Sequence, residues 1–403
     1  MKWACGRGSG QRMGKQSGVR RRQAPGAAVL GFALALLAPA VVRADGSSYP
    51  EKTGVVADVG TGPHLYAPGM GKINIIDPRT LKYQGLIQTT AYNGVWWGQL
   101  GFSPRGDRVY TTTTYYSQDG RHDRRDVVKI WRMPALTPAG EIDIPPRQVM
   151  SGAARELMTV TADGRWLYLQ NATPATSVTV VDLAAGKSTA EIPLPGCWGV
   201  YPVASDAHRV AALCGDGGMA LLTTNAAGSA ADIARSGKLF DVDADPLFTA
   251  CQADRDHLYF VSFNGNVYDI DVSGKTARLA AKFPLAEGVE GDWKPSGSQL
   301  LAFVPGARVL YVLMHEHARP GSQDDPASEV WAVDMRTHKV LSRTSLGKAT
   351  GIAYADAGGP ALFVADQGLK GIVRYQVYPQ ARYMVRKDKS IDQLEGRGRL
   401  EVH

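Results

Sequence analysis

A short pattern recurs along most of this 403-residue chain and limits the folds that the chain can adopt. Each copy is a polar turn followed by a short apolar strand that carries an aromatic residue near its start, as in RGDRVYTTTT and DGRWLYLQN. Self-similarity at roughly 50 residues is typical of folds built from repeated supersecondary units. The seven copies are centred on Tyr66, Tyr110, Tyr168, Ala211 (in the place of the aromatic), Tyr259, Tyr311 and Phe363.

A second pattern usually follows the first and consists of an alternating strand, a turn and another strand, as in KINIIDPRTLKYQGLI. Period-two alternation bounded by Gly, Pro, Asp and Asn indicates strands and hairpins. Four short antiparallel strands in each of seven units predict an all-β fold, a seven-bladed β-propeller. Six or eight blades remain alternatives, because the unit at Ala211 departs from the pattern.

The first 44 residues have a composition of their own. They contain eight Lys and Arg and no Asp or Glu. The apolar run PGAAVLGFALALLAPAVV ends at Val42, and Val42 and Ala44 suit a cleavage site. This order predicts an export signal over residues 1–44. A membrane anchor is the alternative, although the apolar run is shorter than the roughly 20 residues that span a bilayer and contains prolines.

Removal of that segment changes the charge of the chain. The full sequence has 45 basic and 38 acidic residues, and loss of eight basic residues leaves 37 against 38. The remaining chain is therefore close to neutral and has no basic excess that would favour nucleic-acid binding. We expect the propeller over residues 45–380 and a mobile basic tail over residues 381–403.

Three cysteines remain after residue 44: Cys197, Cys214 and Cys251. The turn SDAHR lies midway between the first two, so CWGVYPV and RVAALC are expected to be antiparallel neighbours. The two thiols then meet across the open end of a hairpin, and an oxidising compartment favours a structural disulfide between them. A redox-active pair is the alternative, but such pairs usually have the tighter C-x-x-C spacing.

Motifs of catalysis and cofactor attachment are missing. The sequence has no C-x-x-C-H haem site, no G-x-S-x-G nucleophile elbow and no G-x-x-x-x-G-K-[ST] phosphate loop. The strongest metal candidate is LMHEHARPGSQDD, because His315 and His317 would share one face of a strand. No third ligand is apparent, and Arg319 stands where H-E-x-x-H requires histidine. A polar loop is the preferred interpretation, and we assign no catalytic, cofactor-binding or metal-binding residue to this chain.

Two further segments permit either a structural or a binding role. RHDRRDVVKIW is interpreted as a solvated charged loop before a strand or as a docking surface for a partner protein. In NGVWWGQLGF, Trp96 and Trp97 point to opposite faces of a strand. One of them, together with Tyr92, could line a hydrophobic opening, or both could pack in the core.

Several long segments in order resemble the heavy subunit of the quinoprotein amine dehydrogenases, from about residue 55 to residue 376. The sequence is most similar to the large subunit of aromatic amine dehydrogenase and more distantly to the methylamine dehydrogenase heavy chain. The segments are YTTTTYYSQDGRHDRRDVVKIW, LQNATPATSVTVVDLAAG, GCWGVYP, LCGDGG, FVSFNGNVYDIDVSG and VLMHEHARPGSQDDPASEVWAVD.

The resemblance implies a seven-bladed propeller in a periplasmic heterotetramer of two heavy and two light chains. The light chain carries tryptophan tryptophylquinone, so the heavy chain has no cofactor of its own. The implied reaction converts a primary amine, aromatic or methylamine, to an aldehyde and ammonia. Electrons then pass to a blue copper protein such as amicyanin or azurin.

Two site assignments carry over from the resemblance. Cys197 and Cys214 match the disulfide of the family's heavy chain. Tyr92 stands where the family has a phenylalanine at the entrance to the quinone pocket, which implies a role in the substrate channel. The added hydroxyl changes the passage, so the substrate choice of relatives does not transfer directly. A stand-alone periplasmic propeller that binds a ligand or acts as a lactonase-like hydrolase is the second functional hypothesis.

Overall fold

The fold is described from a computed structural model that covers the whole chain. By its contacts the chain divides into two units, Met1–Val55 and Val56–His403. The structure describes residues 58–69, 71–89, 98–118, 121–150, 154–394 and 398–403, all within the second unit. The predicted signal over residues 1–44 therefore lies outside the described residues. No helix in the described residues is both long and apolar enough to cross a membrane.

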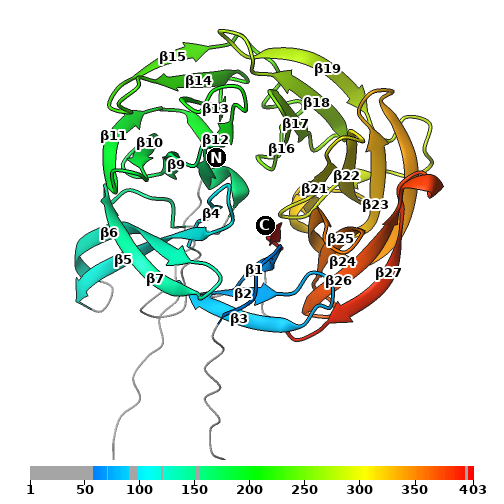
Figure 1. Cartoon of the computed structure of the whole chain (residues 1–403). Helices are drawn as coiled ribbons and strands as arrows, with labels where there is room; N and C mark the ends of the chain where they lie inside the picture. Colours follow the sequence, from blue (N-terminus) through cyan, green and yellow to red (C-terminus); the bar gives the residue numbers. More distant parts are fainter. Residues whose placement is uncertain (1–57, 70, 90–97, 119–120, 151–153, 395–397) are drawn as a thin grey trace, which may run out of the picture. The chain divides into compact units, whose positions relative to one another are not determined.

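Almost all regular structure in the described residues is β-strand, arranged as five four-stranded antiparallel sheets and one eight-stranded sheet. The sheets follow one another around a ring, with strands such as β4, β12 and β16 nearest its axis (Figure 1). The first sheet contains β28 (Glu401–Val402), β1 (Leu65–Gly69), β2 (Lys72–Ile76) and β3 (Tyr83–Gln88).

The next four sheets each use four consecutive strands. They are β4 (Leu100–Phe102), β5 (Arg108–Gln118), β6 (Arg121–Arg132) and β7 (Thr137–Ile144); β8 (Met158–Val160), β9 (Trp166–Asn171), β10 (Ser177–Asp182) and β11 (Lys187–Pro193); β12 (Cys197–Pro202), β13 (Arg209–Cys214), β14 (Met219–Thr224) and β15 (Ala231–Arg235); and β16 (Gln252–Asp254), β17 (His257–Val261), β18 (Asn266–Asp271) and β19 (Arg278–Pro284).

The eight-stranded sheet explains why seven separate sheets are not found. Strand β24 runs without interruption through 18 residues. Its first part pairs with β23 and its second part with β25, which merges two groups of strands. The sheet comprises β20 (Lys294–Pro295), β21 (Leu301–Val304), β22 (Val309–His315), β23 (Ala327–Asp334), β24 (Lys339–Asp356), β25 (Pro360–Asp366), β26 (Gly371–Tyr378) and β27 (Met384–Ile391). Three short 3-10 helices complete the described elements: η1 (Arg155–Leu157), η2 (Ser322–Asp324) and η3 (Pro379–Ala381).

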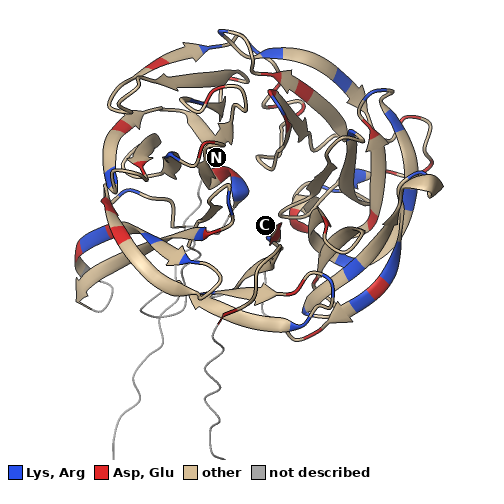
Figure 2. Cartoon of the chain, in the orientation of Figure 1, with Lys and Arg blue, Asp and Glu red and all other residues tan. Residues whose placement is uncertain are grey.

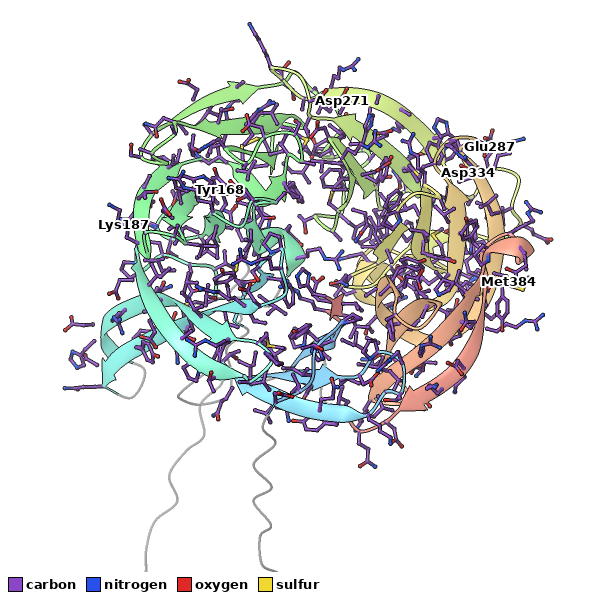
Figure 3. The ribbon with its side chains drawn as sticks, viewed as in Figure 1. Tyr168, Lys187, Asp271, Glu287, Asp334 and Met384 are labelled. Carbon is purple, nitrogen blue, oxygen red and sulfur yellow. A yellow bond between two sulfur atoms is a disulfide. The ribbon has the colours of Figure 1, made fainter. Side chains whose placement is uncertain are left out.

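The residues of the repeated pattern belong to the buried core of the ring. All seven have at most 3% of their surface exposed, because their strands are covered on both faces by neighbouring sheets. Tyr168 illustrates the arrangement, since it lies inside the ring of sheets (Figure 3) and its hydroxyl contacts Thr224 of the next sheet at 3.0 Å. The predicted all-β, propeller-like fold is thus confirmed, and the repeat marks the strands β1, β5, β9, β13, β17, β22 and β25.

The predicted boundary at residue 380 is wrong. Strand β27 pairs with β26 along its whole length, and β28 pairs with β1, with Leu65 opposite Val402. The charged composition that predicted a tail has a structural origin. Strand β27 is the outermost strand of its sheet, and of its eight residues only Val385 is buried. Lys and Arg are common on such exposed edge strands because they discourage edge-to-edge association.

The closing strand generates a prediction about stability. Leu400, which precedes β28, is 2% exposed and packs with Leu65 and Phe363. We expect Leu400→Ala to lower the free energy of unfolding by about 2–4 kcal/mol, because it removes buried methyl groups at the seam of the ring. Leu369→Ala is the matched control, since Leu369 is 39% exposed. Equal urea midpoints for the two variants would show that the C-terminal segment does not close the ring.

Candidate functional site

Most of the candidate functional segments lie at the same end of the ring. In a four-stranded antiparallel sheet, the turn between the second and third strands and the connection to the next sheet lie at the same end, because strand direction alternates. We call this end the loop face. It receives the β5–β6 turn, the β22–β23 loop with His315, and the start of β12 with Cys197.

The predicted channel residue Tyr92 and the pair Trp96–Trp97 lie outside the described residues. The flanks of their segment are described, and both are fixed to β5. The Thr113 hydroxyl donates to the Thr89 carbonyl at 2.8 Å, and the backbone N–H of Gln99 donates to the Thr112 hydroxyl at 2.9 Å. The connection between β3 and β4 therefore leaves and rejoins the described chain beside β5, at the loop face.

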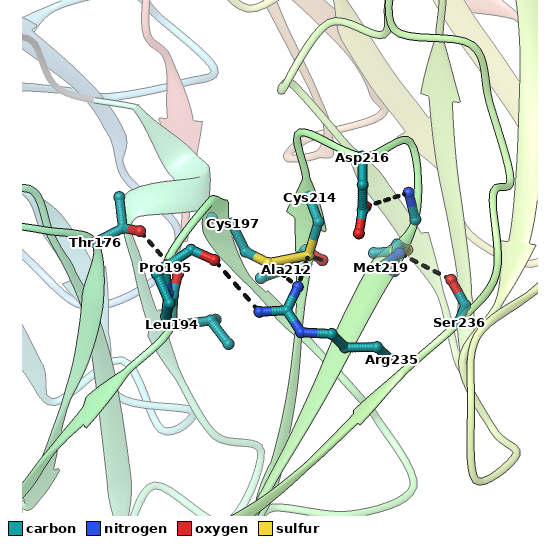
Figure 4. Close-up of a disulfide and its surroundings, with 12 residues drawn as sticks. Thr176, Leu194, Pro195, Cys197, Ala212, Cys214, Asp216, Met219, Arg235 and Ser236 are labelled. Carbon is teal, nitrogen blue, oxygen red and sulfur yellow. Dashed lines mark hydrogen bonds between the residues drawn. A yellow bond between two sulfur atoms is a disulfide. The ribbon is translucent and has the colours of Figure 1, made fainter.

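The structure contains the predicted disulfide between Cys197 and Cys214. The two residues are directly opposite on β12 and β13, with Cα atoms 4.0 Å apart, as the hairpin interpretation required. Figure 4 shows the Arg235 guanidinium beside the sulfur atoms, with Nη1 at 3.2 Å from Cys197 Sγ and 3.4 Å from Cys214 Sγ. Both cysteines are buried, which fits a structural staple at the loop face.

The histidine pair considered for metal binding does not converge. Strand β22 ends at His315, which is 6% exposed and has Nε2 at 3.4 Å from the Ser322 hydroxyl. Burial lowers the pKa of His315, which favours the neutral imidazole. The chain then turns, and His317 adopts a φ of 62° with an 87% exposed side chain. Within the described residues, no group of three or more His, Cys, Asp and Glu could hold a metal ion.

A polar cluster that the sequence did not reveal lies near the axis of the ring. The Arg155 guanidinium donates to both carboxylate oxygens of Glu401, at 2.9 and 2.8 Å. Arg399 donates to the same carboxylate at 3.3 Å and to the backbone carbonyls of Ala154 and Leu100 at 3.0 and 2.9 Å. The cluster therefore joins the C-terminal segment to the starts of β4 and β8.

Electrostatics in this axial cluster follow from its burial. Burial alone would raise the pKa of Glu401, but the charges of Arg155 and Arg399 outweigh it and hold that pKa below its usual value. For the cation Arg399, burial acts in the opposite direction and lowers the pKa. No local signal could have identified the cluster, because Arg155 and Glu401 are 246 residues apart.

The third cysteine lies beside the axial cluster. Cys251 is unpaired, and its thiol contacts the Gln252 carbonyl at 3.3 Å. Burial raises the pKa of Cys251, so the thiol stays protonated and is a weak nucleophile and a poor metal ligand. The adjoining cavity has a volume of about 30 Å³, which matches one water molecule rather than a substrate.

A larger groove of about 380 Å³ opens at the loop face between the β17–β18 turn and the connection from β19 to β20. Its rim carries Glu287, which points outward in Figure 3, and Asp292. Trp293 forms part of its wall, but the Arg343 guanidinium already covers one face of the indole at 4.5 Å. A cation of the chain itself thus covers one of the two indole faces that an aromatic site could offer to a ligand.

These features define a class: an all-β, propeller-like protein whose candidate functional segments gather at one end of a ring of sheets. The chain belongs to the methylamine dehydrogenase heavy chain family, because the sequence model of that family matches residues 70–395.

Individual relatives are distant. The chain is 23% identical to the methylamine dehydrogenase heavy chain of Methylobacillus flagellatus over 278 residues, which covers 68% of each sequence. It is 22% identical to the corresponding chain of Paracoccus versutus over 294 residues, which covers 71% of this chain and 66% of the relative.

Solved structures resemble the chain in fold. A periplasmic gluconolactonase of Pseudomonas aeruginosa superimposes with a TM-score of 0.58 at 16% identity, covering 84% of this chain and 98% of the other. A putative 6-phosphogluconolactonase of Bacteroides fragilis gives 0.58 at 12% identity, with 87% and 99% covered. At such identities the likeness extends to the fold alone.

The disulfide yields a stability prediction. Replacement of both Cys197 and Cys214 by alanine should lower the free energy of unfolding by about 3 kcal/mol, because the bond closes a loop with a sequence separation of 17. Urea unfolding measures the loss. Dithiothreitol should destabilise the wild type and leave the double variant unchanged. A reductant effect of equal size on both would contradict a stabilising role for this bond.

The axial cluster yields a pH-dependent prediction. Because the pKa of Glu401 is lower in the folded than in the unfolded state, ionisation of Glu401 stabilises the fold above about pH 4.3. This contribution is lost as the pH falls through the folded-state pKa. Glu401→Gln should cost about 2 kcal/mol at pH 7, since Arg155 and Arg399 lose the charged acceptor of their hydrogen bonds, and the cost should shrink in acid.

Urea unfolding at several pH values measures this dependence, with Glu287→Gln at an exposed rim position as the control. A destabilisation by Glu401→Gln that is constant from pH 7 to pH 3 would show that the carboxylate charge is not responsible.

Proposed function

We propose that this chain is the heavy subunit of a periplasmic amine dehydrogenase. The observation that carries the proposal is the match to the heavy chain family over residues 70–395. The propeller-like ring supports it, because such a ring is a rigid scaffold that displays loops for recognition. In this role the chain positions a catalytic light chain and helps to form the passage for the substrate.

The proposal includes a seven-bladed architecture. We interpret the eight-stranded sheet as two blades that share β24, divided near Leu346–Ala349. In support, β24 pairs with β23 from Lys339 to Ser345 and with β25 from Ala349 to Asp356. The sheet also contains two of the seven pattern residues, Tyr311 and Phe363, whereas each other sheet contains one. Five blades plus these two give seven.

The reaction follows from the proposed assembly of two heavy and two light chains. The light chain would supply tryptophan tryptophylquinone, which oxidises a primary amine to an aldehyde and ammonia. Electrons would then pass to a blue copper protein such as amicyanin or azurin. Aromatic amines are favoured over methylamine by the sequence segments quoted above. The contribution of this chain would be the β3–β4 connection at the loop face, where Tyr92 is proposed to border the substrate channel.

Export to the periplasm is part of the same proposal. It is supported by the basic and apolar order of residues 1–44 and by the Cys197–Cys214 disulfide, since such bonds persist in oxidising compartments. The alternative of a stand-alone lactonase-like hydrolase has fold likeness in its favour, but the part of the chain that the structure describes offers it no metal site. The metal pair on which that hypothesis relied is separated by the end of β22.

Purification from the native cells tests the proposed division of labour. A small light chain with a quinone absorption band should accompany the full chain, and the complex should reduce a redox dye when an aromatic amine is added. The chain expressed alone should bring about no amine-dependent dye reduction, because the reactive group belongs to the partner. Amine oxidation by the isolated chain, or lactone hydrolysis that is lost in a His315→Ala and His317→Ala double variant, would refute the proposal.

A further inference from the structure

Strands β5 and β6 extend beyond the rest of their sheet as a two-stranded ribbon. Strand β4 pairs with β5 only as far as Thr111, and β7 pairs with β6 only from Asp126 onward. Residues 112–118 and 121–125 therefore pair chiefly with each other, and we call them the β5–β6 arm. At the left of Figure 1, β5 and β6 extend outward beyond the neighbouring sheets of the ring.

One face of the arm is braced against the body of the ring. Asp126 is completely buried and accepts two hydrogen bonds from the Arg124 guanidinium, at 2.8 and 2.6 Å. Asp126 also accepts hydrogen bonds from the Thr114 hydroxyl and from the backbone N–H of Gln148, at 2.8 and 3.1 Å. Arg124 further donates to the Gln148 carbonyl at 3.1 Å. The ribbon is thus held in position before any partner arrives.

The opposite face of the arm presents a patch of ionic and aromatic groups. Arg125 donates to Asp143 at 2.6 Å and to Glu141 at 3.2 Å, and Tyr115 donates to Glu141 at 2.6 Å. The Arg125 guanidinium also lies 5.7 Å from the centre of the Tyr115 ring. Arg125 is half-exposed, so the patch can form hydrogen bonds to another chain without breaking the core.

The root of the arm adjoins the connection that carries Tyr92. The flanks of that connection, Thr89 and Gln99, bond to Thr113 and Thr112, the first residues of the arm. A partner that contacts the described flanks of this connection would therefore meet the arm as well. Within the described residues, the outer edges of 114–118 and 121–125 pair with no third strand. A pre-ordered ribbon of this kind can pair with a strand of another chain, and it loses little entropy when it does so.

We propose that the β5–β6 arm is a docking element for the catalytic light chain and that it binds the light chain through the Tyr115–Arg125 patch and through the strand edges that are unpaired among the described residues. This inference rests on the proposed function. An exposed ribbon of this length is otherwise a liability for edge-to-edge association, which a permanent partner removes.

The test shortens the arm without disturbing its brace. Replacing residues 117–123 by Asn-Gly joins Tyr116 to Arg124 through a two-residue hairpin turn and keeps the Arg124–Asp126 pair. A second variant, Arg125→Glu, reverses one charge in the patch. The matched control is Lys187→Glu, because Lys187 is exposed on the outer side of the ring (Figure 3) at a turn between the third and fourth strands, opposite the loop face.

Binding is measured by titrating each full-length heavy chain with the light chain purified from the native complex. We expect both arm variants to raise the Kd at least about tenfold and the control to leave it unchanged. Thermal unfolding identifies any variant that fails to fold. If the shortened arm does not fold, the Kd of Arg125→Glu decides whether the arm contacts the light chain. If the wild type binds the light chain and both folded arm variants bind it with the same Kd, the arm proposal is overturned. Absence of any light chain binding by the wild type would overturn the proposed function instead.

Discussion

The ring of sheets depends on how its two ends are joined. The first sheet takes β1, β2 and β3 from the beginning of the described chain and β28 from its end, with Tyr66 opposite Glu401. Strand pairing at this seam comprises two residue pairs, and His64 and His403 exchange two further backbone hydrogen bonds beside them, so backbone hydrogen bonds alone are few. The seam is reinforced by the burial of Leu400 and by the bonds of Glu401 to Arg399 in the same segment and to Arg155 in η1, which precedes β8 of another sheet. The charge pair is strong here because it is partly shielded from water.

Closure of the ring determines what the loop face can do. Each sheet covers the faces of its neighbours, so an open seam would expose apolar strands such as β1 and β25 at the same time. With the seam closed, the connections at the loop face begin and end on strands that do not move relative to one another. Recognition by loops is efficient in such a case, because little conformational entropy is lost on binding. Charged residues of both signs lie around the ring (Figure 2), so no single-sign field directs partners to one place.

Sequence reasoning recovered what local patterns encode. Alternation and turn residues predicted the strands, the aromatic pattern identified one buried strand in each unit, and the turn at SDAHR aligned Cys197 with Cys214. It missed what depends on contacts between distant segments. Strand β27 is charged because it is exposed, which is also how a tail looks in sequence. The arm was visible only as a charged loop, since the brace at Asp126 needs Gln148 from the following connection.

The failure of the histidine pair shows why the same alternation that predicts strands is unsafe for predicting sites. His315 and His317 share a face only if the strand continues through both residues. Strand β22 stops at His315 because the chain must turn toward η2, and a left-handed conformation at His317 reverses its direction. His315 is then buried beside Ser322 and serves the packing of the loop. In a scaffold of this kind, the conformation of the residues at strand ends is determined first by the turn that follows. Side chains that converge on one site at the loop face therefore have to come from several sheets or from another chain.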